Sequence, residues 1–234
     1  SVLGFGTGNL QDAKMEAMAD NGNGNFFYVD DLREARKVFV QEIAGTLVTV
    51  AKDVKLQIEF NPQHVAGYRL IGYENRALAD HEFDDDSVDS GDIGAGHSVT
   101  ALYEIVPIGV ESDVAIRTTA ELRYQQTAPS DASSSDELAY VRIRYKEPDG
   151  AVSRLIEVPV ATTVSEASED VRFAAAVAGF GMLLRGSEHS GGTTIDMIRG
   201  LARSGRGVDE LGYRTEFIDL VDRYARLRTV EAEN

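Results

Sequence analysis

The sequence predicts an α+β protein whose secondary structure changes type twice along the chain. In residues 1–52, apolar runs at strand and helix spacing alternate, which is typical of a β-α-β-α segment from a doubly wound sheet. In residues 53–163, short strands of alternating polarity are separated by turn residues, which favours an antiparallel β-sandwich. Residues 164–234 return to helical spacing and form a predicted C-terminal helical region. We therefore expect three consecutive parts with these boundaries.

The first part opens on a short apolar strand at residues 2–5, which ends in a glycine-rich turn. Asn9 is a suitable N-cap for a helix that reaches about Ala19, and an aromatic strand is expected at residues 25–29. Because strands that alternate with helices at this pitch form parallel sheets, we expect the two strands to belong to one parallel sheet.

A second helix is expected after Asp30 or Asp31, since either side chain can accept a hydrogen bond at the helix N-terminus. Apolar residues recur at helical spacing as far as Val50, so this helix is expected to fill the rest of the first part. The residues of its apolar face are Leu32, Ala35, Phe39, Ile43, Thr46, Leu47 and Val50.

The β-sandwich-like part begins with a strand at residues 54–60, where apolar residues alternate with Lys55, Gln57 and Glu59. Residues 147–150 have the composition of a turn and would join two strands as a hairpin. Further strands are expected at residues 66–73, 98–106, 116–124, 138–145 and 154–160.

Helical spacing dominates from residue 165 onward. Ser165 or Ser168 can cap a first helix, residues 194–203 form a second, and the third carries apolar residues between 213 and 227. The expected apolar face of the first helix consists of Phe173, Val177, Phe180 and Leu184.

Composition narrows the classes of partner. The formal net charge of −16 disfavours nucleic acid and anionic membrane surfaces, and it favours cationic ligands or basic patches on proteins. Much of this charge could also serve solubility alone. The absence of cysteine excludes disulfides, thiolate zinc sites and cysteine nucleophiles. The longest apolar run, residues 173–184, is too short to span a bilayer, so we expect no membrane insertion by this segment.

Carboxylates crowd the segment 80–92 and suggest a cation site. Oxygen ligands at this density can bind calcium, and we expect weak calcium binding at Asp84, Asp86 and Asp89. The segment does not fit the EF-hand template, because Val88 stands where a ligand is needed and no glutamate closes the loop. The alternative interpretation is an acidic loop that is simply solvated.

Two further groups of residues each allow two interpretations. His97 lies beside Ser98 and just after the acidic segment, which would suit a hydrolase, but a histidine bonded to the backbone at a strand entry fits the same sequence. Arginines on strands with alternating tyrosines could form a stacking surface for a partner or a paired outer sheet face. These arginines are Arg117, Arg123, Arg142 and Arg144.

Several stretches carry a resemblance to known proteins. Residues 3–9, Leu-Gly-Phe-Gly-Thr-Gly-Asn, and residues 24–32, Gly-Asn-Phe-Phe-Tyr-Val-Asp-Asp-Leu, resemble the last two strands and helices of a von Willebrand factor A domain. Residues 47–60, 68–76 and 94–105 resemble a group of bacterial envelope proteins. In that group an A domain is followed by a C-terminal region of unknown function.

The resemblance implies a binding protein whose metal site lies elsewhere. A domains bind ligands through a divalent ion held by an Asp-x-Ser-x-Ser loop after their first strand, and no such loop stands at an appropriate place here. No metal-site residue can therefore be carried over, and we expect no cofactor in this chain. A divalent ion is expected only on an upstream part of the A domain. Because the chain opens without methionine on an apolar strand, we expect a fragment or a processed product.

The function expected from this resemblance is a non-enzymatic protein-interaction or scaffolding region of a bacterial envelope protein, on the periplasmic side. The alternatives are a hydrolase that uses His97 and the acidic segment, and a cytosolic metal-dependent assembly factor. We expect a protein partner of unknown identity. The strand from Val2 to Phe5 would be an unpaired edge in a truncated A domain, so it could form a homodimer or be shielded by the terminal helices.

Overall fold

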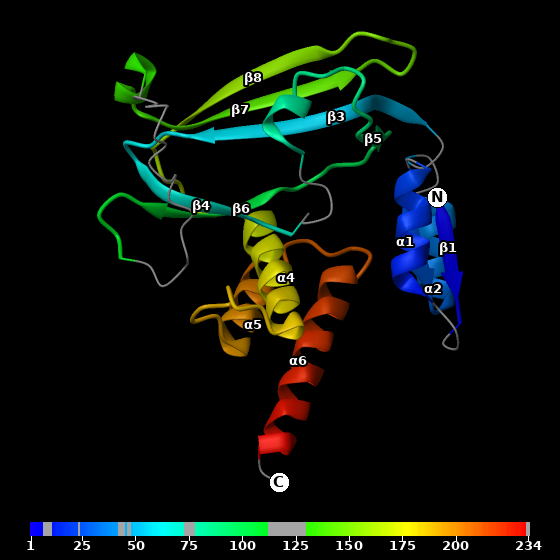
Figure 1. Ribbon diagram of the computed structural model, residues 1–234. Helices are drawn as coiled ribbons and strands as arrows, with labels where there is room; N and C mark the ends of the chain where they lie inside the picture. Colours follow the sequence, from blue (N-terminus) through cyan, green and yellow to red (C-terminus); the bar gives the residue numbers. More distant parts are fainter. Residues whose placement is uncertain are drawn as a thin grey trace. The chain divides into compact units, whose positions relative to one another are not determined.

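A computed structural model describes residues 1–6, 11–22, 24–41, 45, 48–72, 78–111 and 130–232 of the chain (Figure 1). It is a mixed helix and sheet protein, which confirms the predicted α+β class. Contacts between residues group the chain into two compact units. The first unit combines Ser1–Phe60, Arg76–Val99 and Glu137–Val160, and the second combines Asn61–Asn75, Thr100–Asp136 and Ala161–Asn234. Each unit is described separately below.

The first unit starts with the predicted parallel strand pair. Strand β1 (Val2–Phe5) pairs with β2 (Phe26–Val29) in parallel register, with Val2 opposite Phe26. Helix α1 (Asp12–Asn21) connects them and contacts both strands. The helix begins after Gln11, and the predicted cap Asn9 lies outside the described residues.

The second helix is shorter than the sequence predicts. Helix α2 (Leu32–Arg36) continues as a π-helical turn (Lys37–Gln41), and the Asp31 carboxylate caps it by accepting the N–H of Glu34 at 2.8 Å. The expected continuation to Val50 is wrong, because Val50 lies in strand β3 (Thr49–Phe60). Strand β3 pairs with β5 (Gly91–Gly94), and this pairing favours a strand over a helix at Val50. The β-branched residues at positions 48–50 suit a strand when a partner strand is present.

Strand β3 belongs to a four-stranded antiparallel sheet with the order β5-β3-β7-β8 (Figure 1). Strands β7 (Glu137–Lys146) and β8 (Arg154–Ala161) are neighbours in it, and the N–H of Gly150 closes the turn between them on the carbonyl of Glu147 at 2.8 Å. The predicted hairpin is therefore confirmed. Among the described strands, β8 lies at one edge of this sheet.

The register of β3 and β7 gives the sheet one charged and one apolar face. Lys55 lies opposite Arg144 on the charged face, and Leu56 lies opposite Ile143 on the apolar face. An ion pair with Arg142 places Glu157 of β8 on the charged face, so the alternate residues of β8 lie on the apolar face. The apolar face carries Leu56, Ile58 and Phe60 of β3, Ala139, Val141 and Ile143 of β7, and Ile156, Val158 and Val160 of β8.

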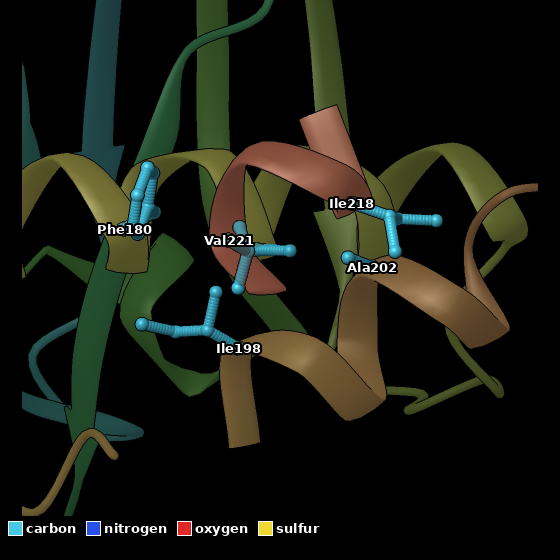
Figure 2. Packing of buried hydrophobic residues seen from close by; sticks show 6 residues of the cluster. Phe180, Ile198, Ala202, Ile218 and Val221 are labelled. Carbon is cyan, nitrogen blue, oxygen red and sulfur yellow. The ribbon is translucent and has the colours of Figure 1, made fainter. Parts of the chain in front are cut away.

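The second unit combines a two-stranded sheet with the three predicted C-terminal helices. Strands β4 (Val65–Ile71) and β6 (Leu102–Pro107) are antiparallel. Helices α4 (Glu169–Arg185), α5 (Ile195–Ser204) and α6 (Tyr213–Ala232) follow. Their buried cluster contains Ala176, Phe180, Ile198, Ala202, Ile218 and Val221 (Figure 2).

Local signals set the ends of these helices. Ser168 caps α4 and Thr194 caps α5, each by accepting the N–H three residues on. Gly186 ends α4 in the left-handed conformation with φ of 60°, which a residue with a side chain adopts only at a cost. Arg69 of β4 ties the sheet to the segment after α4, because it pairs with Glu104 at 2.5 Å and donates to the His189 carbonyl at 3.0 Å.

The buried face of α4 differs from the predicted one. Phe180 is buried as expected, but Val177 and Leu184 are 45% and 55% exposed. Ala176 is buried and Leu183 packs against the cluster instead. Helix α4 is apolar on more than one side, so spacing alone could not select the face, and small residues let α5 approach closely.

The antiparallel strands thus lie in a four-stranded sheet of one unit and a two-stranded sheet of the other. The β-sandwich and the three-part division of the chain stay predictions, and the predicted strand at residues 116–124 lies outside the described residues. Within the described part of the chain, no helix combines the length and apolar character needed to cross a bilayer.

Candidate functional site

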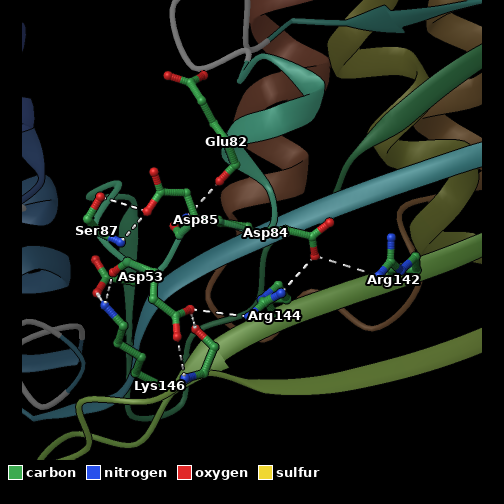
Figure 3. A network of polar contacts seen from close by, with 11 residues as sticks. Asp53, Glu82, Asp84, Asp85, Ser87, Arg142, Arg144 and Lys146 are labelled. Atoms are coloured by element: carbon green, nitrogen blue, oxygen red, sulfur yellow. Dashed lines mark hydrogen bonds and ion pairs between the residues drawn. The ribbon is translucent and has the colours of Figure 1, made fainter.

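The acidic loop, residues 80–92, is bound to the charged face of the four-stranded sheet by a polar network (Figure 3). Lys55 of β3 lies in this network and is only 3% exposed. Its ammonium donates to the backbone carbonyl of Glu82 at 3.0 Å and to that of Asp85. Because a buried charge is tolerated only with hydrogen-bond partners, these two bonds hold the loop backbone over β3.

Arginines of β7 bind the side chains of the same loop. Arg144 donates to Asp84 at 2.7 Å and to Asp86 at 3.3 Å. Between these contacts Phe83 is buried, with the guanidinium carbon of Arg142 at 4.9 Å from its ring centroid. Such a cation–π contact combines apolar burial with electrostatic attraction. The loop is therefore anchored by an aromatic side chain as well as by charges.

A bulge in β3 supplies the third attachment. The register between β3 and β7 shifts around Asp53, which has a φ of 49°. Lys146 of β7 donates to the Asp53 carboxylate at 2.6 Å and to the Asp86 carbonyl at 2.8 Å. The Ser153 hydroxyl and amide both donate to the Asp86 carboxylate.

These contacts shift the protonation equilibria of the charged groups. Burial would raise the pKa of Asp53, but hydrogen bonds from Lys146 and Ser90 outweigh it and hold that pKa below its usual value of 3.8. Hydrogen bonds from Ser153 likewise lower the pKa of Asp86. The hydrogen bond to Asp53 raises the pKa of the Lys146 ammonium. All three groups are therefore charged near neutral pH.

The predicted calcium ligands lie within this network. Asp84 and Asp86 face Arg144, and Asp89 lies near Asp53. Across the described ranges, no group of three or more His, Cys, Asp or Glu side chains is placed to hold a metal ion. Calcium binding stays a prediction, and an incoming ion would have to compete with Arg144 for its ligands.

The described part of the chain places no activating group in hydrogen-bond contact with the His97 ring. Its side chain is exposed, and its backbone N–H donates to the carbonyl of Gly94 at 3.1 Å. Among the described residues, no hydrogen bond or ion pair joins the His97 ring to a serine, aspartate or glutamate. A general base needs such partners within reach. The geometry therefore adds no support to the hydrolase hypothesis.

The arginines on the sheet form a paired outer face. Arg142 donates to the side-chain amide oxygen of Gln57 at 3.0 Å and lies 3.5 Å from the Glu157 carboxylate. Asp84 contacts both guanidinium groups, at 3.8 Å from Arg142 and 2.7 Å from Arg144, although the buried Nε of Arg142 has no hydrogen-bond partner among the described residues. The other two arginines of the predicted set, Arg117 and Arg123, lie outside the described residues.

A second surface, on the apolar face of the same sheet, is exposed. All eight residues of β8 are exposed, including its apolar side chains. On the apolar face, Ile156, Val158 and Val160 are 45%, 47% and 37% exposed, and Leu56 of β3, which lies beyond β7 on the same face, is 43% exposed. We call these four residues the β8 surface. Exposed apolar side chains gathered on one face of a sheet are typical of a binding site for another polypeptide.

Sequence reasoning found strand β8 but missed this surface. Leu155 and Val158 are apolar although they lie on opposite faces, a pattern typical of a strand covered on both sides. The position of β8 at a sheet edge depends on strand order, which the sequence does not give. The local hint was Pro159, because proline within a strand is tolerated mainly at an edge.

The fold defines the chain as an α+β protein with antiparallel sheets. The family described as "Uncharacterized protein YfbK, C-terminal" matches residues 45–227, and the chain belongs to that family. The chain is also similar to the uncharacterized protein YfbK of Escherichia coli (strain K12), with 46% identity over 225 residues. That alignment covers 95% of this chain and 38% of the relative, so the chain spans well under half of the relative's length. No solved structure matches the chain.

Proposed function

We propose that this chain is a non-enzymatic protein-interaction region of a bacterial envelope protein that carries a von Willebrand factor A domain. The β8 surface is the observation that carries the proposal. It exposes large apolar side chains in an edge strand, where a partner could bury them and also pair with the backbone. By contrast, the charged face of the same sheet is already occupied by the acidic loop.

The N-terminal strand pair would be the end of the A domain. Strands β1 and β2 are parallel, as the last two strands of that domain would be. The family match begins at residue 45, after this pair, which supports an origin of the preceding segment in a different domain. Among the described strands β1 pairs only with β2, so its other edge is available to a preceding strand or to a second copy.

The proposed location is the periplasmic side of the envelope, on the strength of the resemblance to envelope proteins. The alternative is a cytosolic metal-dependent assembly factor. Fractionation of cells that express the full-length protein, followed with one marker protein for each compartment, separates the two. Recovery with the periplasmic marker is expected, and recovery with the cytoplasmic marker would contradict this part of the proposal.

Capture from envelope extract tests the interaction itself. The chain is immobilised as the native sequence, as the double variant Ile156→Asp and Val158→Asp, and as the control Val152→Asp. Val152 is 75% exposed in the turn before β8, so the control adds the same charge beside the β8 surface. We expect one set of proteins to bind the native chain and the control but not the double variant. Identical capture by all three chains, or none by any, would refute the proposal.

A further inference from the structure

We propose that β8 binds its partner by strand addition, and that the partner segment is extended, with apolar residues alternating with lysine or arginine. This inference rests on the proposed function and specifies its mode. Strand β8 is the edge of its sheet among the described strands, so one side of its backbone has no neighbouring strand in that order. Unpaired N–H and C=O groups at an edge are a template for another strand.

Strand β8 has few of the features that protect sheet edges. Edge strands are commonly blocked by lysines, by short length or by a covering segment. Strand β8 has eight exposed residues and contains no lysine. Its one cation, Arg154, stands at the first position and pairs with Glu147 at 3.0 Å. Pro159 removes a single N–H donor, which restricts the register of an added strand without preventing its pairing.

The side chains of β8 define what an added strand must present. Ile156, Val158 and Val160 project from one face of the sheet, so every second residue of the partner would be apolar. On the opposite face β8 presents Leu155 and Glu157, and the Glu157 carboxylate is 43% exposed while it lies 3.5 Å from Arg142. A lysine or arginine opposite Glu157 would form a cross-strand ion pair.

The net charge of the chain favours a different protein over a second copy of this chain as the partner of β8. Each chain carries a formal net charge of −16, which disfavours a second copy at β8 relative to a basic segment. A basic segment would be attracted by the same charge, which raises the rate of encounter. The occupant is therefore a segment of another protein, and its basic residues alternate with the apolar ones.

A designed peptide tests this mode without knowledge of the natural partner. The probe is a fluorescein-labelled eight-residue peptide in which valine alternates with lysine, matching the eight residues of β8. Binding is measured by fluorescence anisotropy against the whole chain. Two further peptides carry N-methyl groups on alternate backbone amides, one on the valines and one on the lysines. Because only one set of amides can face β8, one peptide should lose affinity by about tenfold or more and the other should not.

Matched controls separate charge from backbone pairing. A peptide with glutamate in place of lysine should not bind. The variant Glu157→Lys should bind the lysine peptide more weakly than Glu166→Lys, an exposed change outside β8, and circular dichroism checks that both variants are folded. Equal binding of both N-methylated peptides, equal binding of the glutamate peptide, or cross-linking of two chains through β8 would overturn the inference. No peptide binding, with extract capture still dependent on Ile156 and Val158, would overturn strand addition and leave the proposed function standing.

Discussion

Lys146 of β7 lies with its ammonium 2.6 Å from the carboxylate of Asp53, in the bulge of β3. Asp53 is the one non-glycine residue with positive φ in the described part of the chain. Aspartate tolerates this conformation better than most residues, and here the ion pair holds its side chain toward the neighbouring strand. The bulge, the ion pair and the acidic loop are thus one structural unit, because Lys146 also donates to the loop at Asp86.

Removal of the ammonium should loosen this unit. Lys146→Met leaves the Asp53 carboxylate without its cation, and we expect the melting temperature to fall by about 2–5 °C. Asp53→Asn should lower it less in the Lys146→Met background than in the native chain, because both changes remove the same contact. Lys14→Met, at an exposed position of α1, is the control and should have little effect. Additive effects of the two changes would show that the contact does not stabilise the fold.

The attachment of the acidic loop should weaken when the pH falls below 3.8, the usual pKa of an aspartate. The pKa of Asp53 and of Asp86 is lowered in the folded chain, so each carboxylate contributes stability above pH 3.8 that is lost as the pH falls through the lowered pKa. The amides of Ser90 and Ser153 donate to these carboxylates, so their NMR shifts report the titration.

Both amides should titrate with midpoints below 3.8, while the amide of Gly150, which donates to a backbone carbonyl, should change little. Midpoints at or above 3.8 would contradict the hydrogen bonds that hold the loop. At high pH the dependence of stability on pH has the opposite direction for Lys146. Its raised pKa means that its contribution is complete below the ordinary lysine value of 10.5 and is lost as the pH rises through the raised value.

Calcium should bind more readily once the arginine is removed. Arg144 neutralises Asp84 and Asp86 in the native chain, so an added cation gains little there. We expect isothermal titration with calcium to give a weak signal or none for the native chain and a stronger one for Arg144→Ala. Arg154→Ala, which removes an exposed arginine at the start of β8, is the control. A native affinity equal to that of Arg144→Ala would show that Arg144 does not compete for the site.

Local features of this fold were predictable from the sequence, and features that join distant segments were not. The caps at Asp31 and Ser168, each one of two predicted candidates, and the turn at residues 147–150 depend on neighbours in the chain, and each was predicted. The strand at Val50 was missed because its partner, β5, lies some forty residues away along the chain, and short-range spacing matched a helix equally well.

In the candidate surfaces, too, the features set by local sequence were predictable and the features that join distant segments were not. Alternation identified Arg142 and Arg144 as outward-facing residues of a sheet, and the paired interpretation of them agrees with the structure. The burial of Phe83 within the acidic loop and of Lys55 beneath it could not be foreseen, because it requires the loop to fold back on strands that are distant in sequence. The exposure of β8 is a consequence of strand order and is likewise invisible to local patterns.

Two glycines of α4 offer a matched test of the helix packing. An added methyl group at Gly181 would meet no atom within 4 Å, whereas one at Gly179 would lie 3.3 Å from the Ile198 side chain. Because alanine stabilises a helix interior relative to glycine, Gly181→Ala should raise the free energy of unfolding by about 0.5–1 kcal/mol. Gly179→Ala should gain less or lose stability in urea denaturation. A larger gain at Gly179 would contradict the close approach of α5 to α4.

The central claim is that β8 is where a partner protein binds, and carbene footprinting of side chains tests it most directly. The full-length protein is labelled alone and in the presence of the partner captured from envelope extract, and the labelled residues are identified by mass spectrometry. We predict strong protection of Ile156 and Val158 in the complex, with Val152, Val177 and Leu184 labelled as before. Unchanged labelling of Ile156 and Val158 in a complex that protects other surfaces would contradict the account.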